Sequence, residues 1–320
     1  MSFDPSLLAG VDEPVRRYFG HAIAAGAPLA RAMRLQMSGR VKADLWLPFR
    51  AEEELDGRSF SWRARVGLGP LTLVEIADRY SHGVGSSEGL LFGRRPLFAK
   101  ADEDTARSAA GRAALESVVF AAPSVLPQRG VARRAERDER LVARFDLPPE
   151  RPEIEVRIDS QGAIRQVSGA RWGPLDGEGY GYISCGCDVQ AERRFGDVTI
   201  PSKLTVSWRF GTPCQAPFFK AEITAAEPIA LGDWAQAGSA GCCGAGSGFG
   251  GSGGISGSPG GLGMGWSGST GPGTSNAGAV WVMGVSYPSR ALEKPWPVSA
   301  RRLLAPRARN GWRDRRGDHC

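Results

Sequence analysis

The chain has 320 residues, 40 of them basic and 34 acidic, which gives a formal net charge of +6. Residues 231–320 carry nine Lys or Arg against four Asp or Glu, so residues 1–230 hold 31 basic against 30 acidic side chains and are almost neutral. A neutral folded part lacks the basic surface of a nucleic-acid-binding domain, and no apolar run reaches the roughly 18 residues of a membrane helix. We therefore expect no nucleic-acid partner and no transmembrane segment.

The N-terminal residues predict a helix. Pro14 suits the first turn of a helix, and Val15, Tyr18, Phe19 and Ile23 follow at roughly helical spacing. The segment before them lacks the basic start and the uninterrupted apolar stretch of a secretory signal, so we expect a cytoplasmic protein.

Alternation of apolar and polar residues dominates the next part of the chain. It occurs at 33–37, 60–66, 141–147, 154–158 and 203–210. This alternation is typical of antiparallel strands with one buried and one exposed face. In the clearest segment we expect one set buried (Leu204, Val206, Trp208 and Phe210) and the other exposed or at the rim (Lys203, Thr205, Ser207 and Arg209).

Short Asp/Gly segments at 56–57, 159–162 and 196–197 separate several of these runs. Asp-Gly and Gly-Asp pairs adopt the positive φ angles of tight hairpins, so we expect about ten strands in hairpin succession.

One strong helix is predicted at residues 102–122. Acidic residues at 102–104 suit the positive end of a helix dipole, and Pro123 and Pro127 stop the helix. Gly111 and the alanines around it give a face of small residues, which allows close approach to a sheet. The predicted fold class is α+β: a curved, mainly antiparallel, half-barrel-like meander with this helix on its concave side and the N-terminal helix beside it.

The composition divides the chain into a single β-rich domain at 1–230 and a tail at 231–320. The tail holds 22 of the 44 glycines, and residues 238–278 are rich in Gly and Ser without any hydrophobic period. Such a segment buries too little surface to offset its ordering entropy, so we expect it to be disordered. Only the apolar run at 280–285 could add a strand. A natural linker and a frameshifted end are both open interpretations.

A possible catalytic motif lies at 85–89. Its sequence, GSSEG, matches the G-x-S-x-G pattern of α/β-hydrolases, and His82 is close by. That motif needs a sharp strand-to-helix turn, whereas Gly93 and Pro96 prevent a long helix here. We expect Ser87 in a hairpin loop with no histidine within reach, and keep a serine hydrolase using Ser87 as an alternative function.

Three cysteines raise the question of a metal. Cys185, Cys187 and Cys214 fall in the domain, but a structural zinc site takes four ligands, commonly as two spaced pairs. No fourth ligand of matching pattern is present, so we expect thiols on or beside strands, with no metal and no cofactor.

The long helix carries a polar row, Ser108, Arg112 and Glu116, at i, i+4 and i+8. One interpretation is a solvated face. In the other, the row turns toward the sheet, where it lines a cavity or bonds to strand residues such as Arg171.

Seven short motifs occur in order along the domain. They are PVRRYF (14–19), PFRAEE (48–53), ARSAAGRAALESV (106–118), VLP (125–127), ARWG (170–173), IPS (200–202) and FFKAEI (218–223). Over about residues 14–228 this pattern resembles a bacterial family known only as a domain of unknown function, which implies no particular activity. The predicted outline is also similar, at the level of fold, to the half-barrels of periplasmic lipoprotein carriers, which hold acyl chains between a curved sheet and its helix.

The favoured function is non-catalytic binding of an apolar or amphiphilic small molecule in the concave face of the sheet, because inward aromatic side chains under a small-residue helix can leave an apolar space. The alternatives are the serine hydrolase and a structural or partner-binding protein without a ligand. The predicted ligand-binding residues are Phe60, Trp62, Ser108, Arg112, Glu116, Arg171, Trp208 and Phe210.

Overall fold

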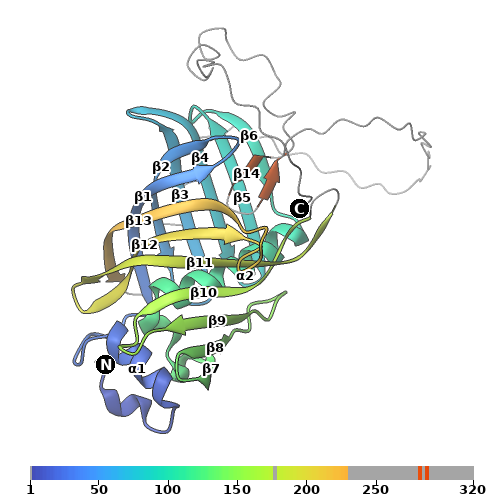
Figure 1. Cartoon of the computed structure of the whole chain (residues 1–320). Coiled ribbons are helices and arrows are strands. Elements are labelled where there is room, and N and C mark those ends of the chain that lie inside the picture. Colours follow the sequence, from blue (N-terminus) through green and yellow to red (C-terminus); the bar gives the residue numbers. More distant parts are fainter. Residues whose placement is uncertain (1, 176–178, 230–279, 283–284, 288–320) are drawn as a thin grey trace, which may run out of the picture.

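The computed structural model describes residues 2–175 and 179–229, together with two short strands at 280–282 and 285–287. Thirteen strands of this part form one antiparallel sheet that curves around a long helix, α2 (Glu103–Phe120) (Figure 1). In chain order the strands are β1 (Ala32–Lys42), β2 (Trp46–Leu55), β3 (Phe60–Leu68), β4 (Leu71–Ser81), β5 (Val84–Leu91), β6 (Arg95–Lys100), β7 (Ala132–Arg137), β8 (Arg140–Arg144), β9 (Glu153–Ile158), β10 (Ile164–Pro174), β11 (Tyr180–Phe195), β12 (Val198–Trp208) and β13 (Ala216–Ile229). The predicted fold class is confirmed.

Two meanders make up the sheet. The first runs from β1 in the middle to β6 at one edge, and the second runs from β7 at the other edge back to β13, which pairs with β1. Helix α2 carries the chain from one edge to the other. The strand number exceeds the expected ten because the edge strands, such as β6 and β7, are mostly exposed and show little apolar alternation.

The predicted hairpin turns are confirmed. Gly57, Gly162 and Gly196 have φ angles of 86°, 90° and 59°, the left-handed conformation that glycine adopts without strain. The flanking strands pair directly across these turns, with Leu55 opposite Phe60 and Phe195 opposite Val198.

The alternation predicted for β12 holds at its start and fails at its end. Leu204 and Trp208 are buried and Lys203 is exposed, but Ser207 is also fully buried, and Val206 and Phe210 are only half-buried. The pairing of β12 with β13 shifts register between Val206 and Ser207, which breaks the alternation there. Gln215, from the loop after β12, donates a hydrogen bond to the Ser207 hydroxyl at 3.3 Å. Arg209 has a φ of 50°, which turns the chain out of the strand and takes Phe210 out of the alternation.

Helix α2 begins and ends where the sequence predicts. The Asp102 carboxylate accepts a hydrogen bond from the backbone N–H of Thr105 at 2.8 Å and caps the helix. The N-terminal half then lies directly against the sheet. A Cβ added to Gly85 of β5 would come within 2.7 Å of the Ala106 Cα, and one on Gly111 would come within 3.0 Å of the Arg171 side chain. Small residues therefore set the distance between helix and sheet.

The N-terminal helix α1 (Glu13–Ala22) lies at the other end of α2, near β7 to β9 (Figure 1). The Tyr18 hydroxyl donates a hydrogen bond to the Val118 carbonyl of α2 at 2.9 Å. Three short 3-10 helices complete this end: η1 (Pro5–Leu8), η2 (Ala122–Val125) and η3 (Pro127–Arg129). Of the helices in the described residues, none combines the length and apolar character that crossing a membrane requires.

Strand β13 ends at Ile229, close to the predicted domain boundary. The prediction of a disordered tail at 231–320 falls almost entirely outside the described residues. The apolar run at 280–285 overlaps two short strands, β14 (Val280–Val282) and β15 (Val285–Tyr287), which pair with each other and form a sheet separate from the 13-stranded one.

Candidate functional site

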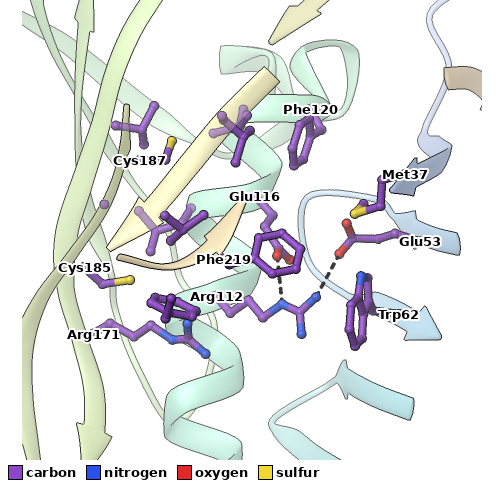
Figure 2. Close-up of a pocket in the computed structure, with 17 residues that line it drawn as sticks. Met37, Glu53, Trp62, Arg112, Glu116, Phe120, Arg171, Cys185, Cys187 and Phe219 are labelled. Atoms are coloured by element: carbon purple, nitrogen blue, oxygen red, sulfur yellow. Dashed lines mark hydrogen bonds and ion pairs between the residues drawn. The ribbon is translucent and has the colours of Figure 1, made fainter. Parts of the chain in front are cut away.

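A cavity of about 60 Å³ lies between the C-terminal half of α2 and the concave face of the sheet (Figure 2). Most of its wall is apolar, with Leu115, Val119 and Phe120 from the helix and Met37, Val167, Leu204, Val206, Phe218 and Phe219 from the strands. The volume is enough for a few waters but is below the ~150 Å³ of an apolar cavity that admits benzene. The cavity is therefore a partly closed space whose enlargement requires its walls to move.

Arg112 lies at the polar end of this cavity and binds three carboxylates. Its guanidinium donates from Nη1 to Asp78 and from Nε to Glu116, both at 2.8 Å, and Nη2 lies 3.5 Å from Glu53 (Figure 2). The Arg112 side chain is only 4% exposed. Burial alone would lower the pKa of Arg112, but the surrounding carboxylates outweigh burial and raise it above its ordinary value. Arg112 is therefore a permanent buried cation.

Glu53 and Glu116 form an acid pair around Arg112. Figure 2 shows their carboxylates directed toward the guanidinium from two sides. Glu53 is only 1% exposed, and burial, followed by the negative charge of Glu116, raises the pKa of Glu53 well above its ordinary value. In the described part of the chain, no third residue donates a hydrogen bond to the Glu53 Oε2 or the Glu116 Oε2 atom. A proton held by Glu53 hydrogen-bonds Glu116 and relieves their repulsion.

Asp78 joins this cluster to Ser87. The Ser87 hydroxyl donates to Asp78 at 2.5 Å, and burial raises the pKa of Asp78 against the opposing influence of Arg112 and Ser87. Ser87 is buried within strand β5, so its predicted loop position is wrong. The motif at 85–89 is continuous strand because Gly85 and Gly89 give room to Ala106 and Phe98, respectively.

The histidines make other contacts. His82, in the turn before β5, hydrogen-bonds Ser81 through Nδ1 at 2.7 Å, and His21 of α1 lies 2.7 Å from Glu192. His319 lies outside the described residues. The strand-to-helix turn required by the hydrolase motif is absent at Ser87, since β5 is followed by β6.

Arg171 on β10 is the second buried cation. It donates to the Ser108 carbonyl at 3.0 Å and to the Ser108 hydroxyl at 3.3 Å. Burial lowers the pKa of Arg171 from its ordinary value. The polar row on α2 thus turns toward the sheet, as in the second of the two interpretations.

Two cysteines of β11 line the same cavity. Cys185 and Cys187 are buried free thiols, and burial raises the pKa of both, that of Cys187 to about 12. Among the residues that the structure describes, no group of three His, Cys, Asp or Glu side chains is arranged to hold a metal ion.

Of the eight predicted ligand-binding residues, Trp62, Arg112, Glu116 and Arg171 line the cavity. Three others lie just behind the lining. Phe60 lies under the Arg112 guanidinium at 4.5 Å, Ser108 holds Arg171, and Trp208 stacks on Phe218 with ring centroids 5.5 Å apart. Phe210 lies outside the cavity, against Gly186.

Two acidic residues of the cluster, Glu53 and Asp78, are missing from the prediction. The sequence does contain a signal for both. Glu53 lies in phase with the buried Ala51 and Leu55, and Asp78 lies midway between the buried Ile76 and Tyr80. A carboxylate at an inward strand position must be neutralised or paired, which marks it as unusual.

Comparison with solved structures gives distant likenesses. A LolA superfamily protein from Nitrosomonas europaea has 8% identity and a TM-score of 0.38, over 69% of this chain and 94% of that one. A domain described as an outer membrane lipoprotein-sorting protein, from Vibrio parahaemolyticus, has 9% identity and a TM-score of 0.37, over 66% of this chain and 91% of that one. No curated protein sequence matches the chain.

The family is established by sequence. The motifs at 14–19 and 218–223, on which the resemblance to a domain of unknown function rests, both lie in the region that the family model covers. The chain belongs to DUF6920, a family of unknown function, whose model matches residues 9–227.

Proposed function

We propose that the domain binds an apolar or amphiphilic small molecule, without catalysis, in the cavity under α2. One observation carries the proposal: the cavity has a mostly apolar wall with a few charged groups gathered at one end. Ligand sites of proteins commonly combine a large apolar surface with a small number of convergent polar groups. An amphiphile would place its chain among the apolar side chains and its polar end beside Arg112 and Glu53.

The helix supports this proposal because its two halves contact the sheet differently. Gly85 and Gly111 hold the N-terminal half in direct contact with β5 and β10. Farther along, Leu115 and Val119 face the cavity rather than a strand backbone. A ligand larger than the present volume would enter by displacing this C-terminal half or by rotating the rings of Phe120 and Phe219.

Native mass spectrometry of the full chain, purified from its host, tests the proposal. We expect a lipid-sized mass on the protein, and a rise in melting temperature with a panel of amphiphiles. The variant Val206→Trp should lose both, because Val206 lines the cavity and indole would fill it. Val84→Trp is the matched control, since Val84 is 66% exposed on β5.

If Val206→Trp fails to fold, Cys187→Phe provides a second way of filling the same cavity. An adduct-free spectrum together with an unchanged melting temperature across the panel would overturn the proposal. It would then favour the structural or partner-binding alternative.

A further inference from the structure

Three buried polar atoms at the cavity lack partners in the described residues. They are Glu53 Oε2, Glu116 Oε2 and the indole nitrogen of Trp62. All three side chains line the cavity, and Glu53 and Trp62 are each only 1% exposed. Buried polar atoms in proteins almost always have hydrogen-bond partners, so unpartnered atoms that face one cavity mark its polar end as a candidate binding site. Two of the three are carboxylate oxygens, which can accept hydrogen bonds from a donor bound at this end of the cavity.

The arginines of the cluster are occupied. Each side-chain nitrogen of Arg112 faces a carboxylate, and Arg171 donates from Nε and Nη2 to Ser108. An anionic ligand would therefore have to displace existing ion pairs. A cationic ligand would meet two carboxylate oxygens to which no third residue donates.

The charge balance leads to the same conclusion. The charged and titratable groups that face the cluster are Glu53 on β2, Asp78 on β4, Arg112 and Glu116 on α2, Arg171 on β10, and Cys185 and Cys187 on β11. With neutral thiols, three carboxyl groups surround two guanidinium groups, which leaves one negative charge in excess. In the ligand-free protein, a proton on Glu53, which hydrogen-bonds Glu116, cancels this excess charge. A bound cation would do the same.

We propose that the polar end of the cavity is a site for a protonated amine, whose N–H groups donate to Glu53 Oε2 and Glu116 Oε2. This inference rests on the proposed function and specifies the headgroup of the amphiphile. Binding would exchange one positive charge for another: the ammonium enters the site, and the proton on Glu53 leaves to solvent. The site is neutral before and after, so the buried cluster never carries an uncompensated charge. The Trp62 ring already lies 5.1 Å from the Arg112 guanidinium, so this end of the cavity includes a cation–π contact.

Three amphiphiles with the same chain separate the possibilities: decylamine, decanol and decanoate. Titrations of the full chain at pH 8, followed by tryptophan fluorescence and calorimetry, should show decylamine binding at least about tenfold tighter than decanoate, because charge-assisted hydrogen bonds favour the amine. Decylamine affinity should rise with pH for as long as Glu53 of the ligand-free protein holds a proton, since binding displaces that proton, whereas decanol affinity should stay constant.

The variant Glu53→Gln should reduce decylamine affinity to about that of decanol, because the amide keeps the shape of the carboxyl group but cannot accept the charge. Glu88→Gln is the control for non-specific attraction, because Glu88 is an exposed carboxylate on β5. This variant should leave the order of affinities for the three amphiphiles unchanged. Glu116→Gln serves as a second test if Glu53→Gln is poorly folded by circular dichroism.

Each outcome has one meaning. If decanoate binds as tightly as decylamine, or Glu53→Gln keeps the preference for the amine, the amine site is wrong and the cavity remains a general apolar site. If none of the three amphiphiles binds, and Val206→Trp behaves as the wild type, the proposed function itself fails.

Discussion

The two halves of helix α2 differ in how they meet the sheet. In the N-terminal half, the helix backbone touches β5 so closely that a single Cβ on Gly85 would collide with Ala106. In the C-terminal half, Leu115, Val119 and Phe120 face a cavity instead. One helix thus serves as an anchor at one end and as the wall of a cavity at the other. Residue size along the helix sets the difference, because small residues allow contact and larger ones keep the strands apart.

Arg112 lies at the boundary between these halves. A buried ion cluster seldom adds stability over an apolar core, because desolvation of the charges offsets their attraction. The cluster around Arg112 also leaves two carboxylate oxygens without donors. These two features are the basis of the proposed amine site.

The largest expected effect comes from Arg112→Met. Removing the guanidinium leaves Glu53, Asp78 and Glu116 without their common cation, and breaking a buried ion pair costs about 3–5 kcal/mol of unfolding free energy. Urea denaturation measures the loss. The loss should shrink as the pH falls toward 5, because protonation then neutralises the buried acids.

Arg151→Met is the control for that experiment. Arg151 and its partner Asp146 are 87% and 78% exposed, so this change should cost less than about 1 kcal/mol. Equal losses in the two variants would show that the cluster contributes nothing specific.

The anchored half of α2 is tested by Gly85→Ala. The added Cβ meets the backbone of Thr105 and Ala106, which cannot rotate away, so we expect a loss of about 1–3 kcal/mol in unfolding free energy. Gly20→Ala is the opposite case: no atom lies within 4 Å of its Cβ position in α1, and helix propensity should stabilise the protein by up to about 1 kcal/mol. A tolerated Gly85→Ala would mean that the helix is not fixed at this end.

Much of the fold could be predicted from the sequence, and less of the site. Period-two alternation and Asp-Gly turns identify the central strands and hairpins because each depends on local residues. The pairing of β1 with β13 joins residues nearly 200 positions apart, from Ala32 to Ile229, and no local pattern encodes it. The polar row on α2 could be found from helical spacing. That Glu53 and Asp78 come from β2 and β4 to meet Arg112 follows only from the curvature of the sheet.

A smaller effect, on how the unfolding free energy depends on pH, is expected from Glu53→Gln. The pKa of Glu53 is raised from an ordinary value of 4.5, so the folded protein holds this proton more tightly than the unfolded chain. The stability that Glu53 contributes is therefore full below pH 4.5 and is lost as the pH rises through the folded-state pKa. Glutamine does not titrate. The variant should match the wild type near pH 4.5 and become progressively more stable than the wild type as the pH rises through the folded-state pKa of Glu53.

Thermal and urea unfolding from pH 4.5 to 8.5 measure this difference in stability between Glu53→Gln and the wild type. In the control variant Glu88→Gln, the unfolding free energy should depend on pH as it does in the wild type. A difference that does not change with pH would mean that Glu53 is ionised in the folded protein.

The last experiment perturbs the protein least. It measures alkylation of the native thiols to find which wall of the cavity moves. Burial raises the pKa of Cys187 to about 12, so at pH 8 only about one molecule in ten thousand carries the reactive thiolate. Alkylation by iodoacetamide, read peptide by peptide in a mass spectrometer, should therefore be slow in the folded protein and fast in urea. Because Cys187 lines the cavity, a bound amphiphile should slow its alkylation further, by several-fold, without changing the unfolding free energy of the empty protein. The Arg171 guanidinium opposes the effect of burial on the pKa of Cys185, so Cys185 should react at least as fast as Cys187. Rapid alkylation of Cys187 in the absence of ligand would show that the C-terminal half of α2 already moves away from β11. An alkylation rate that is the same with and without the amphiphile would show that the amphiphile binds elsewhere.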